Sequence, residues 1–348
     1  MPHVSCISVT YGPTPEIFSL LESVQRHSDD ISYDMTVVTQ PSDGGSMAEE
    51  ISRWAPWVRV IALDSNIGFG PANNLAIEQV SGEFIALLNP DIVVTEGWLP
   101  PLLSALDDGA VFVAAPPLLS TEGRVDEAGQ VMFTDGGSDA IGGPQWPNDY
   151  EQMMFNRDVD YASAACWLMR RSEFLELGGF DPAYAPAYFE DPDLAFTARS
   201  RGLVSRLVVD RPVVHAHAVA SESRVALAER SRKIFQAKWA EVLQSQPTRL
   251  KSSEDGSRAR DHLCPSRTLI LIGDTVADAE VIAIIEKAGV AAAAQPRERV
   301  AVALSARPFV EGLRRRLSRM GLEIIQQAPL DVLASRREWA TRVERHGV

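Results

Sequence analysis

Short runs rich in β-branched residues alternate with amphipathic segments over the first quarter of the chain, and this alternation constrains the fold more than any other feature. Residues 4–10 are typical of a strand, and the spacing of Ile17, Leu21 and Val24 predicts a helix after it. Strands that alternate with helices pair in parallel, with helices on both faces of the sheet. The sequence therefore predicts an α/β fold, and ligand-binding residues in the loops that follow its strands. Further strands are expected at residues 35–38, 58–63 and 84–88, and a helix through Ile51 and Trp54.

The chain has 348 residues, of which 45% are hydrophobic, so it can bury one large core and a smaller second one. Residues 245–266 are polar and rich in serine, which is typical of a linker. We therefore expect a main domain at residues 1–244, this linker, and a small α/β domain at residues 267–348. In the small domain, strands are predicted at residues 268–272, 300–304 and 322–325, and the last helix near residues 331–345.

The first strand of the small domain is not followed by Gly-x-Gly-x-x-Gly, so dinucleotide binding is not expected there. Asp274 follows that strand without a second acid at its side, which argues against a phospho-acceptor domain. Docking or oligomerisation is the default role for this domain, and the oligomeric state stays open.

The composition excludes some classes of function. A formal net charge of −14 argues against nucleic-acid binding, which needs a clustered positive surface. Cys6, Cys166 and Cys264 are widely spaced, which indicates buried, reduced thiols in a cytoplasmic protein. No apolar run is long enough to span a membrane, and the N-terminus lacks the features of a targeting segment. A soluble cytoplasmic protein is therefore expected.

Three carboxylates lie close together in the stretch Tyr188-Phe189-Glu190-Asp191-Pro192-Asp193-Leu194. Apolar neighbours and like charges raise the pKa of a carboxylate toward the range in which it acts as a base. The alternative is a helix N-terminus, where acids stabilise the first turn and Pro192 fits the first helical position. The two interpretations are compatible, because a helix N-terminus can hold a catalytic carboxylate rigidly.

Two loops after predicted strands carry unusual residues. In the segment 66–74, two glycines permit close backbone approach to a ligand, and asparagines supply amide groups. After the fourth strand comes Asn89-Pro90-Asp91, where an acid at the end of a buried strand needs a positive partner such as a divalent cation. Turn formation is the alternative for the first loop, and a turn or helix cap for Asp91.

Together these motifs resemble the inverting family 2 glycosyltransferases of the GT-A fold, in particular their bacterial rhamnosyltransferase-like branch. The resemblance covers about residues 3–243 and implies a GT-A-type, Rossmann-like mixed sheet flanked by helices. The matching segments are Thr10-Tyr11, the segment from Asn66 to Asn74, Leu88-Asn89-Pro90-Asp91, Trp167-Leu168-Met169-Arg170-Arg171, Gly178-Gly179-Phe180-Asp181, Glu190-Asp191-Pro192-Asp193-Leu194 with Arg199 and Gly202, and His215 after a strand at residues 207–214.

The resemblance implies a divalent cation, Mn²⁺ or Mg²⁺, that bridges the donor diphosphate, with Asp91 and His215 as ligands. His217 is a rival for the place of His215. The resemblance also implies that Asp191 is the general base, although Glu190 is not excluded from that role. The expected acceptor contacts are Trp167, Glu190 and Asp193.

The donor site implied by the resemblance departs from the family at one place. Members commonly carry, after the second strand, an Asp that reads the nucleotide base, whereas this chain has Thr39 and Gln40 there. Asp43 or the main chain would replace that Asp, and the choice between thymidine and uridine diphosphate stays open. The expected donor-binding residues are Thr10, Tyr11, Thr39, Asp43, Asn66, Gly68, Phe69, Gly70, Asn73, Asn74, Asn89 and Asp91.

Two further segments bear on the partners. The glycine-rich segment 121–157 is expected to be irregular, either a lid over the site or a surface excursion. A helix at residues 222–243 carries basic side chains that would face an anionic lipid surface or a lipid-diphosphate acceptor, or else water. Peripheral contact with the inner face of the membrane is one expectation.

The expected activity is metal-dependent, inverting transfer of a sugar from a dTDP-rhamnose-like or UDP-sugar donor to a hydroxyl group of a glycan or lipid-linked polysaccharide acceptor. One alternative is a nucleotidyltransferase, but Tyr11-Gly12-Pro13-Thr14-Pro15 lacks the basic, glycine-rich phosphate loop expected after its first strand. The other is an inactive sugar-nucleotide-binding or scaffolding module, which would lack the base or the metal-binding acid.

Overall fold

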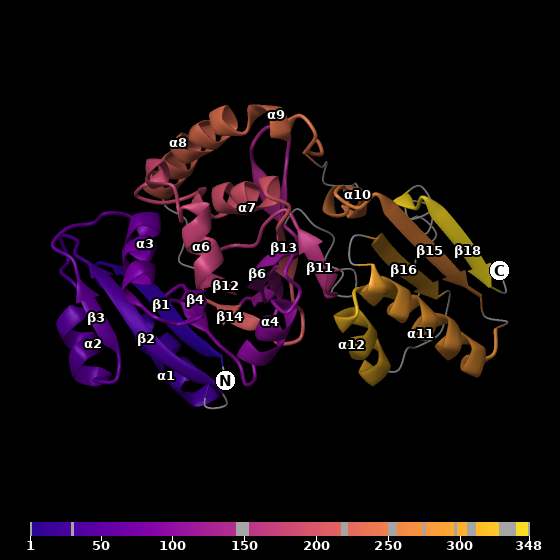
Figure 1. The fold of residues 1–348 in the computed structure, drawn as a ribbon, viewed down its shortest axis with the longest axis horizontal. Coiled ribbons are helices and arrows are strands. Elements are labelled where there is room, and N and C mark those ends of the chain that lie inside the picture. Colours follow the sequence, from indigo (N-terminus) through magenta and orange to yellow (C-terminus); the bar gives the residue numbers. More distant parts are fainter. Residues whose placement is uncertain are drawn as a thin grey trace.

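The computed structural model describes residues 2–28, 31–143, 153–216, 222–249, 256–273, 276–295, 298–304, 311–326 and 339–346. The strands of the main sheet are β1 (His3–Tyr11), β2 (Ser32–Gln40), β3 (Arg59–Ala62), β4 (Phe84–Leu88), β6 (Val111–Ala115), β11 (Arg157–Val159), β12 (Cys166–Arg170) and β13 (Val204–Leu207). They form one mixed sheet in the order β11-β13-β6-β12-β4-β1-β2-β3 (Figure 1). β12 runs antiparallel between β4 and β6, and β1 pairs in parallel with β2 and β4. The predicted mixed α/β sheet is confirmed.

Helices cover both faces of this sheet. They are α1 (Ile17–His27), α2 (Ala48–Trp54), α3 (Phe69–Gln79), α4 (Leu99–Ala105), α6 (Arg171–Leu177) and α7 (Glu190–Ser200). α1, α2 and α4 form one core with Val4 and Cys6 of β1, and α3, α6 and α7 form another with Ile7 and Val9. Because successive strand residues point to opposite faces, a nearly continuous apolar run such as β1 supplies both cores.

A second sheet lies beside the first in the order β5-β14-β7-β8. Its strands are β5 (Ile92–Val93), β7 (Leu118–Leu119), β8 (Val125–Glu127) and β14 (Val213–His215), and β9 (Gln130–Met132) with β10 (Ser138–Ala140) forms a hairpin next to it. The predicted strand at 207–214 is therefore two strands. The segment 121–143 is not irregular, because Val131 and Phe133 bury its short strands in a core of their own. The rest of the predicted irregular segment up to residue 152 lies outside the described residues.

α8 (Glu222–Lys238) lies along the outside of α7 and is followed, after a break at Trp239, by α9 (Ala240–Leu243), where the sequence predicts one helix (Figure 1). Basic side chains of α8 are used within the fold. Lys238 forms an ion pair with Asp193 at 2.8 Å, and Arg230 donates to the carbonyl of Ala185 at 2.8 Å. They hold α8 against α7 and against the chain that precedes it. Among the described helices, none combines the length and the apolarity that a membrane span requires.

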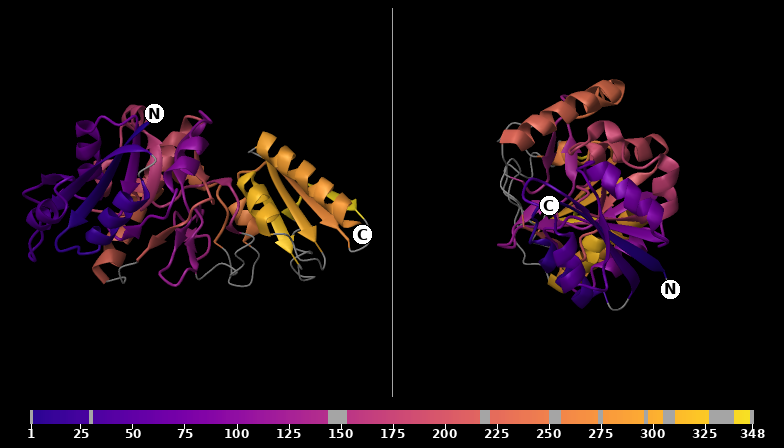
Figure 2. Two further views of the ribbon diagram at one scale, coloured as in Figure 1. Left: turned by 90° about the horizontal axis from the view of Figure 1, so that it is seen from below. Right: turned by 90° about the vertical axis from the view of Figure 1, so that its left-hand side faces the viewer.

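The C-terminal unit is a parallel sheet with the order β17-β16-β15-β18, packed beside the main domain along the longest axis of the molecule (Figure 2). It consists of β15 (Ser266–Ile272), α11 (Asp278–Ala294), β16 (Glu298–Leu304), α12 (Glu311–Arg319), β17 (Leu322–Gln326) and β18 (Arg342–His346). The predicted helix near 331–345 is wrong for its described part, because residues 342–346 form β18 and pair with β15. Asp274 lies outside the described residues. The predicted linker includes α10 (Ser257–Arg260), which is packed between the two units.

Candidate active site

The loop after β4 and the start of α7, far apart in the sequence, both contact the backbone of Ala164 and Ala165. The N–H of Asn89 donates to the carbonyl of Ala165 at 2.8 Å, and the N–H of Ala164 lies 3.4 Å from the Asp191 carboxylate. A cavity of about 400 Å³ opens at this point. Its lining residues are Phe69, Asn89, Ser138, Tyr161, Ser163, Ala164, Ala165, Ala187, Tyr188, Phe189, Glu190, Asp191, Pro192 and Ala228.

The backbone immediately before α7 is strained. Tyr188 and Phe189 have φ angles of 76° and 72°, in the left-handed region that aromatic residues rarely occupy. Such residues cost about 1–3 kcal/mol each and persist only where the surroundings hold them. Here the Phe189 ring packs on Phe235 of α8 at 5.5 Å between centroids, and Ser231 donates to the carbonyl of Ala187. The strain turns the first residues of α7 toward the cavity.

Burial shifts the protonation of the carboxyl pair at the start of α7. Loss of hydration raises the pKa of Glu190 to about 8, with the Asp191 charge adding to it. Burial and the nearby Glu127 charge raise the pKa of Asp191 to about 7, against a lowering by the Ala164 N–H. Among the described residues, the Glu190 Oε2 atom has no hydrogen-bond partner. The pair therefore titrates near neutral pH, as a general base requires.

Glu127 is a part of the site that sequence reasoning missed. Its carboxylate accepts the Ser163 N–H at 2.6 Å and the Gln130 amide at 2.7 Å, and the residue is 7% exposed. It lies close enough to the Asp191 carboxylate to raise its pKa. No sequence signal marks this Glu, because it belongs to the segment expected to be irregular.

The predicted metal ligands lie together at the ends of neighbouring strands. His215 Nε2 is 3.2 Å from Asp91 Oδ1, and the N–H of Ala216 donates to the carbonyl of Asp91 at 3.0 Å. A carboxylate and an imidazole fit Mn²⁺ or Mg²⁺, with an imidazole favouring Mn²⁺. Within the described part of the chain, no cluster of three or more His, Cys, Asp or Glu side chains is arranged for a metal. Other ligands would come from the diphosphate and water. His217 lies outside the described residues.

Of the predicted donor-binding residues at the ends of the first two strands, two are exposed and two are buried. Tyr11 is 58% exposed at the end of β1, and Asp43 lies on an exposed turn after β2. Thr10 and Thr39 are 1% and 0% exposed, so they lie beneath this edge of the sheet rather than on its surface. Gln40, which with Thr39 is predicted to stand in place of the base-reading Asp, is also buried.

Gln40 shapes the loop that precedes α3, at residues 66–68. Its Oε1 accepts the N–H groups of Ile67 and Gly68 at 2.8 and 3.2 Å, and Asn66 Oδ1 accepts the Gly68 N–H at 2.9 Å. The side-chain carbonyl oxygen of Gln40 is therefore committed to the protein backbone.

The segment 66–74 is only partly a loop, because α3 begins at Phe69. Asn74 donates to the Phe180 carbonyl at 2.8 Å and accepts its N–H at 2.9 Å. Asn73 is 1% exposed and donates to the Phe69 carbonyl. Both amides serve the fold. The expectation that Asn73 and Asn74 offer their amides to a ligand is corrected here.

Two of the predicted acceptor contacts are also corrected. Trp167 is fully buried, and its indole N–H donates to the Ala162 carbonyl at 3.0 Å. Asp193 is 3% exposed, and its carboxylate accepts hydrogen bonds from Tyr184, Lys238 and Trp239. Neither side chain is among the described residues that line the cavity. The site contains Glu190 but not these two.

Comparison with known proteins agrees with this geometry. The profile of the family described as "Glycosyl transferase family 2" matches residues 5–178, half of the chain.

The chain is a family 2 glycosyltransferase.

Relatives of this family 2 glycosyltransferase support the assignment. An "N-acetylglucosaminyl-diphospho-decaprenol L-rhamnosyltransferase" from Mycobacterium tuberculosis is 30% identical over 257 residues, covering 66% of this chain and 83% of the relative. "O-antigen biosynthesis protein RfbC" from Myxococcus xanthus is 26% identical over 238 residues, 66% of this chain but 18% of that protein. The solved structure of GalNAc-T7 with UDP, GalNAc and Mn²⁺ superposes with a TM-score of 0.56 at 13% identity, over 70% of this chain and 49% of the other, which confirms the GT-A fold.

If Asp191 is the general base, as predicted, the glycosyltransferase should lose activity as the pH falls through about 7, because the Asp191 carboxyl group must be ionised to accept a proton. Below that point, kcat/KM is expected to fall about tenfold per pH unit for one essential base. The measurement is kcat/KM at constant ionic strength from about pH 5.5 to 9. A profile that stays flat down to the lowest pH would contradict the assignment of a raised carboxyl pKa.

Gly68 of the glycosyltransferase has φ 97° and ψ 167°, and a Cβ there would lie 2.9 Å from the backbone of Pro186. Gly178 is the comparison: its φ is 93° but its ψ is 5°, in the left-handed region, and a Cβ there meets nothing within 4 Å. We expect Gly68→Ala to lower the free energy of unfolding by about 3 kcal/mol and Gly178→Ala by about 1 kcal/mol. Urea unfolding measures both. Equal losses would show that neither the contact with Pro186 nor the glycine-specific ψ of Gly68 contributes to stability.

Proposed function

We propose that this glycosyltransferase moves a sugar from a nucleotide-diphosphate sugar to an acceptor hydroxyl group with inversion of configuration, assisted by a divalent cation. One observation supports this most: the loop that carries Asp91 and the helix that carries Asp191 both contact the backbone at Ala164 and Ala165 beside one cavity. This arrangement supports a leaving-group site next to a proton acceptor, which glycosyl transfer requires.

In the proposed reaction, the acceptor hydroxyl group enters the cavity and Asp191 takes its proton. The hydroxyl oxygen forms a bond to the anomeric carbon from the side opposite the nucleotide, and the bond from that carbon to the diphosphate oxygen breaks with its electron pair leaving on the diphosphate. One displacement of this kind inverts the configuration. When bound by Asp91 and His215, Mn²⁺ or Mg²⁺ supplies positive charge to the leaving diphosphate.

Within the carboxyl pair, Asp191 is the better candidate for the base. Glu190 is 5% exposed, whereas Asp191 is partly exposed and accepts the Ala164 N–H. A general base must lie within reach of the proton that it removes. Burial and the Asp191 charge raise the pKa of Glu190 to about 8, above that of Asp191 at about 7, so Asp191 is the first of the two to ionise as the pH rises.

For the substrates, the name of the Mycobacterium tuberculosis relative favours a rhamnosyl donor and a lipid-linked diphosphate acceptor. We propose a dTDP-rhamnose-like donor first, with UDP-sugars as the alternative, and an acceptor that is a glycan or a lipid-linked saccharide. The Tyr11 ring, exposed at the end of β1, is proposed to contact the nucleotide base. The GalNAc-T7 structure, which holds UDP and Mn²⁺, is consistent with a divalent cation here.

The test is a thermal-shift screen of sugar nucleotides with and without Mn²⁺, followed by product analysis with a saccharide acceptor. A ligand that binds only the folded form raises the midpoint with its concentration. The expected result is a shift with one sugar nucleotide that needs Mn²⁺, and a transfer product of inverted configuration. Binding without transfer would favour the inactive sugar-nucleotide-binding module. Release of pyrophosphate from a nucleoside triphosphate would favour a nucleotidyltransferase.

A further inference from the structure

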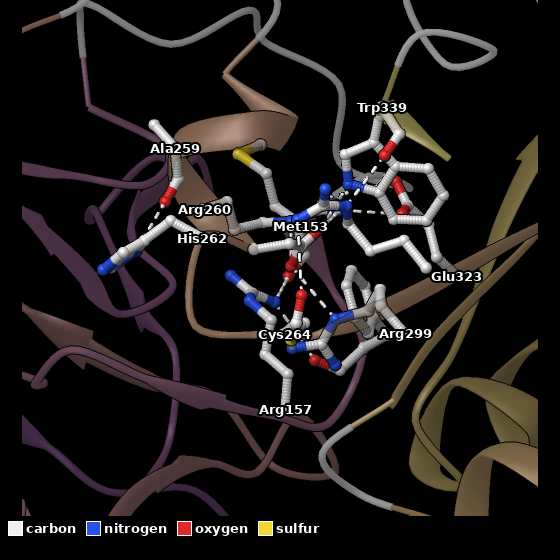
Figure 3. A network of polar contacts seen from close by, with 12 residues as sticks. Met153, Arg157, Ala259, Arg260, His262, Cys264, Arg299, Glu323 and Trp339 are labelled. Carbon is white, nitrogen blue, oxygen red and sulfur yellow. Dashed lines mark hydrogen bonds and ion pairs between the residues drawn. The ribbon is translucent and has the colours of Figure 1, made fainter. Parts of the chain in front are cut away.

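A buried network of charged side chains joins the C-terminal unit to the rest of the chain (Figure 3). Arg260 donates to Glu323 at 2.7 Å and to Asp261 at 2.5 Å, and Arg299 donates to Asp261 at 3.0 Å. The Trp339 indole N–H donates to the same Asp261 carboxylate at 3.1 Å. All four charged residues are at most 7% exposed. Breaking one member of a buried ion network leaves an uncompensated charge, so this junction is a fixed contact rather than a flexible linker.

On the main domain, the junction is built around Phe155 and Arg157. The guanidinium carbons of Arg157, Arg260 and Arg299 lie 4.7, 4.9 and 5.2 Å from the centre of the Phe155 ring. Guanidinium groups at this distance from an aromatic face are held by cation–π attraction. Arg157 also donates to the carbonyl of Ala128 at 2.6 Å. The C-terminal unit therefore packs around the side chain that holds Ala128.

Ala128 is two contacts away from the proposed base. Its neighbour Glu127 accepts the Ser163 N–H at 2.6 Å, and the next residue, Ala164, presents its N–H to the Asp191 carboxylate at 3.4 Å. Displacement of Ala128 would move Glu127, and with it the backbone that holds Asp191. The charge of Glu127 contributes to the raised pKa of Asp191.

A second contact from the same junction reaches the other end of α7. His262 Nε2 lies 3.4 Å from Asp160 Oδ1, which also accepts from Arg199 at 2.8 Å. The other oxygen of Asp160 accepts the Met132 N–H at 2.9 Å. Arg199 is in the last turn of α7, whose first turn carries Asp191. His262 therefore adjoins an ion pair that fixes the catalytic helix at its far end.

We propose that the C-terminal unit is a positioning part of the active site: through Arg157 and Asp160 it fixes the backbone at 127–128 and 160–164, and thereby the carboxylate of Asp191. This inference rests on the proposed function, because it concerns the base of that reaction. It gives the C-terminal unit a role that its sequence does not reveal. Catalysis then depends on Glu323, a residue of this unit that is not among those lining the cavity.

The test compares Glu323→Gln with Glu286→Gln. Both make the same change in the C-terminal unit, but Glu286 pairs with Arg316 at the surface, where the two side chains are 48% and 58% exposed. Glu323→Gln is expected to lower kcat by about 10- to 100-fold, as small displacements of a catalytic group do, with KM for the donor within about twofold. The acidic limb of its pH profile should move to lower pH, because water reaches the base. Glu286→Gln should match the wild type.

A contact that is merely structural would lower the melting temperature of Glu323→Gln without moving the pH profile, and that result would overturn the proposal. Hydrogen exchange decides it independently of activity. Amides at 125–132 and 160–166 should exchange faster in Glu323→Gln than in Glu286→Gln, and equal rates would refute the coupling. If the wild type transfers no sugar, the proposed function fails. The exchange rates still show whether the C-terminal unit fixes the backbone at 125–132 and 160–166. If Glu323→Gln does not fold, His262→Gln is measured in the same way with the same expectations.

Discussion

Asp191→Asn is expected to lower kcat of the glycosyltransferase by about 10²–10⁴-fold, the usual contribution of a general base, and to leave donor binding intact. The amide keeps the size of the side chain and still accepts the Ala164 N–H, which lies 3.4 Å from the carboxylate in the wild type. It cannot take a proton from an acceptor. Initial rates at saturating donor, together with donor affinity from calorimetry, measure the two effects separately.

Glu190→Gln separates the two carboxylates. If Asp191 is the base, Glu190→Gln replaces a carboxyl group that is still protonated when Asp191 ionises, so its kcat falls less than that of Asp191→Asn and the acidic limb of its pH profile stays near pH 7. If Glu190 is the base, the order of the two losses reverses. Asp107→Asn, at an exposed carboxylate after α4, controls for the substitution itself. Wild-type turnover by Asp191→Asn would remove Asp191 from the reaction.

The sequence predicts the first half of the sheet well because the signal there is local. The predicted strand at 84–88 coincides with β4, and those at 4–10 and 35–38 lie within β1 and β2. Runs that are apolar on both faces leave little choice but a buried parallel strand. The segment 121–143 fails for the opposite reason. Its strands have three residues each, and non-local packing around Phe133 decides them.

The site residues also divide into those with a local sequence signal and those whose position depends on non-local packing. Asp91, Glu190 and Asp191 stand in motifs whose order along the chain indicates their place at one sheet edge, and the structure brings their loops together. Glu127 and the Ala164 N–H carry no local signal, because their positions depend on β-strand pairing across the chain. Trp167 and Asp193 fail for another reason: a motif indicates nearness to a site but not the direction of a side chain.

The strain before α7 connects this site to α8. A basic helix at the edge of the domain suggests a membrane-facing surface in sequence, yet Arg230 and Ser231 donate to carbonyls of residues 185 and 187. Those bonds hold the chain that enters the left-handed backbone of Tyr188 and Phe189. The energy stored there is offset by contacts from α8. Arg230 and Ser231 of α8 therefore help to hold the chain that leads into Asp191, the proposed base.

Asp91→Asn should lower kcat/KM by about 10²–10³-fold, the range found when one group that stabilises developing charge is removed. We attribute the expected loss to the proposed metal site, because Asp91 and His215 lie 3.2 Å apart there. An amide oxygen coordinates a cation more weakly than a carboxylate does. The Mn²⁺ concentration that gives half-maximal activity should therefore rise in Asp91→Asn, and Asp107→Asn should leave it unchanged.

His215→Gln tests the second proposed ligand through the preference for Mn²⁺ over Mg²⁺, rather than through the size of the loss in kcat. Imidazole favours Mn²⁺ over Mg²⁺, so replacing it with an amide oxygen should reduce the activity with Mn²⁺ more than the activity with Mg²⁺. Calorimetric titration of Mn²⁺ in the presence of the nucleotide product gives a readout that does not depend on turnover. If both variants bind Mn²⁺ as the wild type does, Asp91 and His215 form an ion pair of structural value only, and the diphosphate must be neutralised by other groups.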